Sequence, residues 1–169
     1  MTEIYVGRNF REHILDPAER EAEQRGFYDF PIVDTDAHHM DTPITELEPY
    51  LAEPWRSRLL AMRSTEIIPH DVGDRHVDGR TKRPKVPRPE GEMFPNCVYH
   101  FKVTQRKLGI DISIVFPTDM LALGLHPDQE LEVAMARAYA HWIVERVCPY
   151  EPGIKTMLYL PFSDPEASL

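Results

Sequence analysis

The chain is organised around the segment Phe30-Pro31-Ile32-Val33-Asp34-Thr35-Asp36-Ala37-His38-His39-Met40-Asp41. Its first part is an apolar run that ends at Asp34 and whose length suits only a short buried strand, Phe30 to Asp34. From Asp34 onward the segment contains three acids and two imidazoles. Because a buried carboxylate without a partner is costly, such a cluster at a strand end requires an ion, hydrogen bonds or water.

Side chains alternate between the two faces of a strand, which groups the polar residues of this cluster. The alternation predicts that Asp34, Asp36 and His38 share one face and that His39 points to the other. A carboxylate and an imidazole two residues apart on one face can form half of a metal site. The alternative is a strand-to-loop junction whose acids cap the next turn.

The composition is that of a soluble globular protein and fits one ordinary domain. The chain has 169 residues, of which 42% are hydrophobic and 28% charged. A net charge of −9 argues against nucleic acid or an anionic membrane surface as the main partner. Cys97 and Cys148 are predicted to be free thiols, and the charged N-terminus resembles neither a signal peptide nor a membrane anchor. These features predict a cytoplasmic location.

Residues 1–29 are predicted to form a polar N-terminal arm, and residues 30–169 the main domain. Within the arm, a helix is expected over Pro17 to Gln24, with Asp16 as its N-cap and Gly26 beyond its end. This arm is either a surface element that contacts another subunit or a helix packed across the bottom of the domain.

Prolines divide the next part of the domain. Pro49 and Pro54 split the helical pattern of residues 45–62 into short helices. Residues 64–97 form a Pro-rich insertion without periodicity, which is read as a basic lid over an anionic substrate or as a solvated insertion.

The remaining chain alternates between helical and strand patterns. A helix over Val98 to Leu108 is expected to end at Gly109 and to precede a second strand, Ile110 to Phe116. A longer helix follows over Asp128 to Val147. Its predicted apolar face consists of Leu131, Met135, Ala138, Trp142 and Ile143, and its polar face of Glu130, Glu132, Arg137 and Glu145.

The last segments predict a third buried strand, Lys155 to Pro161, and a helix start at residues 163–169 with Asp164 as N-cap and Pro165 at its first position. Alternation of strands and helices predicts an α/β fold with a parallel sheet and right-handed crossovers. Three strands are few for such a sheet, so the sequence is expected to be the first part of a larger unit.

Four motifs in register resemble the amidohydrolase superfamily. They are Asp34-x-Asp36-x-His38 after the first strand, Gly109-Ile110-Asp111 with Val115-Phe116-Pro117-Thr118 around the second, Ala138-Tyr139-x-x-Trp142, and Leu160-Pro161-x-x-Asp164-Pro165-Glu166-Ala167. The resemblance covers roughly residues 30–169. It is to the branch that contains aminocarboxymuconate semialdehyde decarboxylase and the resorcylate-type decarboxylases.

This resemblance implies the first three or so βα units of a (β/α)₈ TIM-type barrel, incomplete in this chain, with the active site at the C-terminal ends of the strands. It implies that Asp36 and His38 are metal ligands and that one or two divalent ions (Zn, Mn or Fe) are bound. The remaining ligands and the general acid/base would lie outside this chain.

Further residues are candidates for supporting roles near the metal. Asp34 is read as a hydrogen-bond partner at the strand end, and His39 as a packed residue or a contact to substrate or metal. Thr118, Asp119 and His126 follow the second strand on the side where the active site would lie, so they are predicted near the substrate.

The expected function is that of a metal-dependent hydrolase or non-oxidative decarboxylase acting on a small carboxylated substrate. Homo- or hetero-oligomers are expected, with a partner chain that could complete the barrel. One alternative is a non-catalytic or half-catalytic subunit of such a barrel. Another is a phosphatase of the haloacid dehalogenase type, with Asp34 as nucleophile, Asp36 as general acid and Thr118 holding phosphate.

Overall fold

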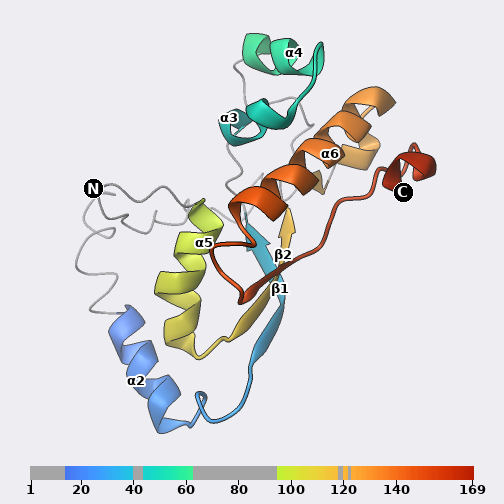
Figure 1. Cartoon of the computed structure of the whole chain (residues 1–169). Coiled ribbons are helices and arrows are strands. Elements are labelled where there is room, and N and C mark those ends of the chain that lie inside the picture. Colours follow the sequence, from blue (N-terminus) through green and yellow to red (C-terminus); the bar gives the residue numbers. More distant parts are fainter. Residues whose placement is uncertain (1–13, 40–43, 63–94, 118–119, 122) are drawn as a thin grey trace, which may run out of the picture.

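The computed structural model describes residues 14–39, 44–62, 95–117, 120–121 and 123–169 (Figure 1). Along the described chain, helices and helical turns alternate with strands. Their order is α2 (Asp16–Gln24), β1 (Val33–His39), α3 (Ile44–Leu47), η3 (Glu48–Tyr50), α4 (Trp55–Met62), α5 (Asn96–His100), η4 (Phe101–Gln105), η5 (Arg106–Leu108), β2 (Ile112–Pro117), η7 (Leu123–Leu125), α6 (Gln129–Arg146), β3 (Ile154–Thr156) and η8 (Pro165–Ser168).

The three strands form one parallel sheet in the order β1-β2-β3. The predicted α/β class and parallel sheet are therefore confirmed. Right-handed crossovers between strands that pair in chain order place the connecting segments on the same face of a sheet. Among the described strands, β1 and β3 are the two edges.

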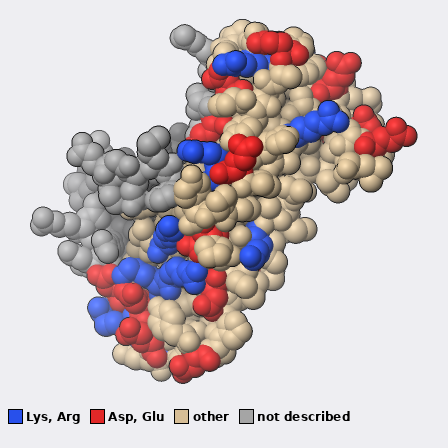
Figure 2. Space-filling model, in the orientation of Figure 1, with Lys and Arg blue, Asp and Glu red and all other residues tan. Residues whose placement is uncertain are grey.

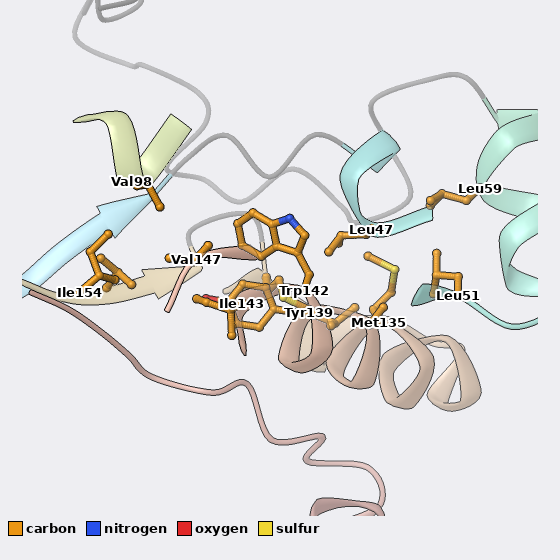
Figure 3. Close-up of a cluster of buried hydrophobic side chains, with 14 of the residues drawn as sticks. Leu47, Leu51, Leu59, Val98, Met135, Tyr139, Trp142, Ile143, Val147 and Ile154 are labelled. Carbon is orange, nitrogen blue, oxygen red and sulfur yellow. The ribbon is translucent and has the colours of Figure 1, made fainter. Parts of the chain in front are cut away.

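A single hydrophobic core covers one face of this sheet. Each strand contributes a buried residue to it, namely Ala37, Val115 and Ile154. Figure 3 shows that the side chains of α6 lie between Val98 and Ile154 on one side and the leucines of residues 47–59 on the other. We call the opposite face, on which residues such as Ile112, Ile114 and Phe116 are only half-buried, the distal face.

Helix α6 is the central element of the core. Its N-cap is Asp128, as predicted, and the carboxylate of Asp128 accepts a hydrogen bond of 3.1 Å from the backbone N–H of Leu131. All five residues of the predicted apolar face are buried. The prediction for Glu132 is wrong: this residue is only 1% exposed, because residues 159–163 cover it.

The helical segment before β2 ends at Gly109, as predicted. Helix α5 continues through a π turn and a 3₁₀ turn to Leu108, and Gly109 then adopts a left-handed conformation with φ of 79°. A Cβ atom on Gly109 would lie 2.8 Å from the Cβ of Phe27. Both the backbone conformation and the close approach therefore require glycine here.

Gly109→Ala is expected to lower the free energy of unfolding by about 1–2 kcal/mol from the left-handed backbone alone, plus the cost of displacing Phe27. Gly109→Asn separates the two effects, since asparagine tolerates this conformation but still meets Phe27. Urea unfolding measures both variants. A loss below about 0.5 kcal/mol for Gly109→Ala would contradict the assignment.

Helix α2 packs against the domain rather than extending from it. Lys107 bonds to both Asp16 (Nζ–Oδ1, 3.1 Å) and Glu19, and the hydroxyl of Tyr28 donates to the carbonyl of Lys107 at 3.1 Å. These contacts lie just before β2, so the helix packs at the bottom of the sheet, the second of the two predicted arrangements. The N-cap prediction is wrong: Leu15 occupies that position, because the carboxylate of Asp16 is bound to Lys107.

The third strand is much shorter than predicted. Strand β3 ends at Thr156, after which the backbone N–H of Met157 still donates to the carbonyl of Val115 at 3.0 Å. Met157, Leu158 and Leu160, predicted to be buried, are about half exposed. The chain leaves the sheet here because its next residues bind Glu132 on α6.

Two predicted boundaries need correction. The helix start at residues 163–169 is present, with Asp164 accepting from the backbone N–H of Ala167 at 3.0 Å, but as the short 3₁₀ turn η8. The last two residues of the predicted insertion at 64–97 belong to α5. Residues 64–94 of that insertion lie outside the described residues.

Candidate metal centre

Strand β1 continues through the polar cluster instead of ending before it. The predicted strand stopped at Asp34, whereas β1 reaches His39 and pairs with β2 as far as Pro117. His38 is therefore held by pairing with Phe116, and Asp36 lies within the same strand rather than in a loop. Both strands run in parallel toward this end, so the cluster lies at the carboxyl edge of the sheet.

A β-bulge interrupts the pairing inside the cluster. Asp34 pairs with Ser113 and Ala37 with Val115, so β1 has one residue more than β2 over this interval. The carboxylate of Asp34 accepts a hydrogen bond of 3.0 Å from the backbone N–H of Asp36. A side-chain bond of this kind to the residue two positions on is an Asx turn, which stabilises the extra residue of the bulge.

The bulge changes the predicted alternation. Because Asp34 pairs with the buried Ser113 and His38 with Phe116, three residues further along β2, Asp34 and His38 lie on opposite faces of the sheet. The prediction that Asp34 shares a face with Asp36 and His38 is therefore wrong, because the extra residue of the bulge shifts the alternation of side chains between the two faces. The predicted hydrogen bond of Asp34 at the strand is present.

Asp36 and His38 come together on the distal face. The neighbouring Ala37 is buried in the core, and Oδ1 of Asp36 lies 3.1 Å from Nε2 of His38. The side chains are 84% and 37% exposed, respectively. Two atoms that bind one tetrahedral metal at about 2.0–2.1 Å lie about 3.3 Å from each other, so the observed separation fits two ligands of one ion.

The imidazole of His38 also contacts the neighbouring strand. It stacks on the ring of Phe116, with centroids 5.6 Å apart and an angle of 25° between the planes. This contact restricts rotation of the imidazole while Nε2 points toward Asp36. Phe116 was not a predicted site residue, and the only signal for it was its place at the end of the second strand.

Of the remaining predicted site residues, the structure describes the side chain of His126 only. Thr118, Asp119 and the side chain of His39 lie outside the described residues. His126 lies before α6, where its Nδ1 accepts a hydrogen bond of 3.0 Å from the backbone N–H of Asp128. In this position His126 supports the start of α6.

Within the described ranges, no group of three or more His, Cys, Asp and Glu side chains is arranged to hold a metal ion. The pair therefore offers two ligands, one hard oxygen and one imidazole nitrogen, and leaves further positions to water, substrate or other residues. A catalytic ion keeps one position open for water or substrate in the same way.

Sequence reasoning missed a second polar cluster, around Glu132. Its carboxylate accepts hydrogen bonds from the hydroxyl of Tyr159 (2.7 Å) and from the backbone N–H groups of Phe162 (2.8 Å) and Ser163 (3.2 Å), and it also binds the hydroxyl of Ser163. Burial raises the pKa of Glu132, but these bonds outweigh it and hold the pKa below its usual value. The helical pattern gave no signal of this, because the donors are about 30 residues away.

No protein-family model matches this chain, and no curated protein matches it. In the part of the chain that the structure describes, no helix combines the length and apolar content needed to cross a bilayer.

Proposed function

We propose that this chain is part of a metal-dependent enzyme of the amidohydrolase type, in which Asp36 and His38 bind a divalent ion. The reaction would be hydrolysis or non-oxidative decarboxylation of a small carboxylated substrate. One observation carries the proposal: a carboxylate and an imidazole with converging donor atoms, 3.1 Å apart, at the carboxyl edge of a parallel sheet. Ligands and substrates of α/β enzymes lie at this edge.

The strand order supports a barrel as the architecture. A doubly wound sheet reverses its strand order and places helices on both faces, whereas a barrel adds strands in chain order with its helices outside. The order β1-β2-β3 follows the chain, and the described core lies on one face. The ligand pair lies on the other face, which in a barrel would be the interior.

The residues of the site have separable roles. Asp36 and His38 would bind the ion, Zn²⁺, Mn²⁺ or Fe²⁺, while Phe116 restrains the imidazole by stacking. A bound divalent ion polarises a carbonyl or carboxylate and lowers the pKa of a bound water. The resemblance implies that the other ligands and the general acid/base come from strands beyond the three described here.

Metal titration of the purified chain tests the proposal. The wild-type chain is expected to bind Zn²⁺ or Mn²⁺, and Asp36→Ala and His38→Ala are each expected to weaken binding by at least about 100-fold. The matched control is His141→Ala, which removes an exposed histidine on α6. Wild-type affinity in both ligand variants would refute the assignment.

Asp34 is expected to position the ligands without binding the ion. Asp34→Ala removes the acceptor that holds the bulge, so metal affinity should fall by about 10- to 100-fold. Asp34→Asn retains an oxygen in the same place and should restore most of the affinity. Equal losses in both variants would mean that the charge of Asp34, and not the Asx turn, matters to the ion.

The same geometry bears on the phosphatase alternative. There Asp34 would attack phosphorus, but its carboxylate is engaged by the backbone N–H of Asp36 and its position pairs with the buried Ser113. Loss of a phosphatase activity in Asp34→Asn, with that activity retained in His38→Ala, would favour this alternative over a metal-dependent enzyme.

A subunit that completes a barrel with a partner chain is the second candidate. It is favoured by the exposed apolar side chains after β3, where Phe162 is 78% exposed and Met157, Leu158 and Leu160 about half. Figure 2 shows few charged side chains along the course of this segment. Denaturing intact mass of every polypeptide in the folded sample, together with its native mass, distinguishes one chain, a homo-oligomer and a complex with a second chain.

A further inference from the structure

Besides the Asp36–His38 pair, the described strands carry a lysine, Lys155, on the distal face of the sheet. Lys155 is the only lysine or arginine in the three described strands. It is exposed, and it lies in the middle of β3. Its neighbours on this face in β2, Ile112, Ile114 and Phe116, are apolar.

The residues on either side of Lys155 fix the face to which it points. Ile154 is buried in the core, and the hydroxyl of Thr156 lies 3.4 Å from the hydroxyl of Tyr139 on α6. Since neighbours in a strand alternate, Lys155 points away from α6. Its pairing with Ile114 gives the same result, because Val115, the next residue of β2, is in the core.

The register also sets the separation of Lys155 from the ligand pair. His38 pairs with Phe116, and Lys155 pairs with Ile114, one step below on the same face. Two strand spacings of about 4.8 Å and two residues of about 3.3 Å place the backbones of His38 and Lys155 about 11–12 Å apart. With both side chains projecting from one face, a molecule of a few carbon atoms can contact both.

Resting on the proposed function, we propose that Lys155 binds an anionic group of the substrate while the opposite end of the substrate reaches the ion at Asp36 and His38. Among the described residues of the three strands on this face, Asp36 supplies the negative charge, so a divalent ion together with Lys155 would make their net charge positive. The described neighbours of Lys155 in β2 on this face are apolar, so its ammonium also requires an anion as its partner if the face becomes enclosed. The substrate class is therefore a small molecule with two separated polar ends, at least one of them a carboxylate.

Two probes of equal length isolate this interaction. Succinate and butyrate share a four-carbon chain, but only succinate has a carboxylate at both ends. With the zinc-loaded full chain, calorimetry is expected to show that succinate binds about five- to tenfold more tightly than butyrate, the size of one partly screened charge-assisted hydrogen bond. Lys155→Met should remove this preference, and Lys155→Arg should retain it.

The control is Lys102→Met, which removes an exposed lysine from the turn η4, and it should keep the preference for succinate. Zinc affinity is measured first on every variant. If the wild-type chain binds no zinc, the proposed function fails and this inference fails with it. If zinc binds and Lys155→Met still prefers succinate as the wild type does, or if Lys102→Met loses the preference equally, only this inference is overturned.

Discussion

Glu132→Ala is expected to lower the free energy of unfolding by about 2–4 kcal/mol, because it removes a buried, charged acceptor of several hydrogen bonds. Without the carboxylate, the backbone N–H groups of Phe162 and Ser163 lose their partners, and so do the hydroxyls of Tyr159 and Ser163. The segment after β3 should then detach from α6. Equilibrium unfolding in urea, with constant m-values, measures the loss.

Two further variants separate the carboxylate from the helix that carries it. Glu130→Ala changes an exposed glutamate on the same turn and should leave stability unchanged within about 0.5 kcal/mol. Glu132→Gln keeps the shape but replaces one acceptor oxygen by a donor, so its loss should be intermediate. Equal stability of Glu132→Ala and Glu130→Ala would refute the role of this network.

The pH dependence of stability provides an independent test. The pKa of Glu132 is lower in the folded protein than its unfolded value of about 4.3, because the hydrogen bonds favour the ionised form. Its contribution to stability is therefore fully present above the unfolded pKa and is lost as the pH falls through the folded pKa. The difference in stability between the wild type and Glu132→Gln should shrink from pH 7 toward pH 3.

Helix α6 and the helix end at Gly109 could be predicted from the sequence alone. Periodicity, capping and a left-handed turn depend on residues that are close together in the chain, so local patterns are sufficient to predict them. The extent of β3 and the burial of Glu132 depend on contacts over about 30 residues, which periodicity does not report.

In the candidate site, too, local features could be predicted from the sequence and long-range contacts could not. The sequence was sufficient to select Asp36 and His38, since their spacing and the strand before them are local. It could not predict the bulge, which depends on how β1 pairs with β2, and so it placed Asp34 on the wrong face. The stacking of His38 on Phe116 and the orientation of Lys155 required the register between strands.

Trp142→Ala is expected to have the largest effect in the core, about 3–5 kcal/mol, the range for truncating a buried aromatic side chain. Trp142 is 1% exposed at the centre of the cluster in Figure 3, beside Tyr139 at a ring distance of 5.9 Å. Its indole N–H donates to the carboxylate of Glu46 on α3 at 2.9 Å. The side chain thus joins α6 to the first helix after β1.

Packing and hydrogen bonding at Trp142 can be measured separately. Trp142→Phe retains most of the ring volume but loses the donor, so it should cost about 1–2 kcal/mol. Glu46→Ala removes the acceptor alone and should cost about as much, whereas Glu46→Gln retains an acceptor and should cost less. Trp55→Ala, a partly exposed tryptophan on α4, is the matched control and should cost about 1 kcal/mol.

Trp142→Ala also tests the proposed metal site, because α3, which Trp142 contacts, begins at Ile44, shortly after β1 with its ligands ends at His39. If Trp142 holds α3 against the core, Trp142→Ala should weaken metal binding at Asp36 and His38 even where the chain is still folded, and Trp55→Ala should not. The indole of Trp142 links α6 to α3 through its hydrogen bond to Glu46. If Trp142→Ala loses stability but keeps full metal affinity, then α3 does not position the ligands, and the bulge of β1 and its pairing with β2 are sufficient to do so.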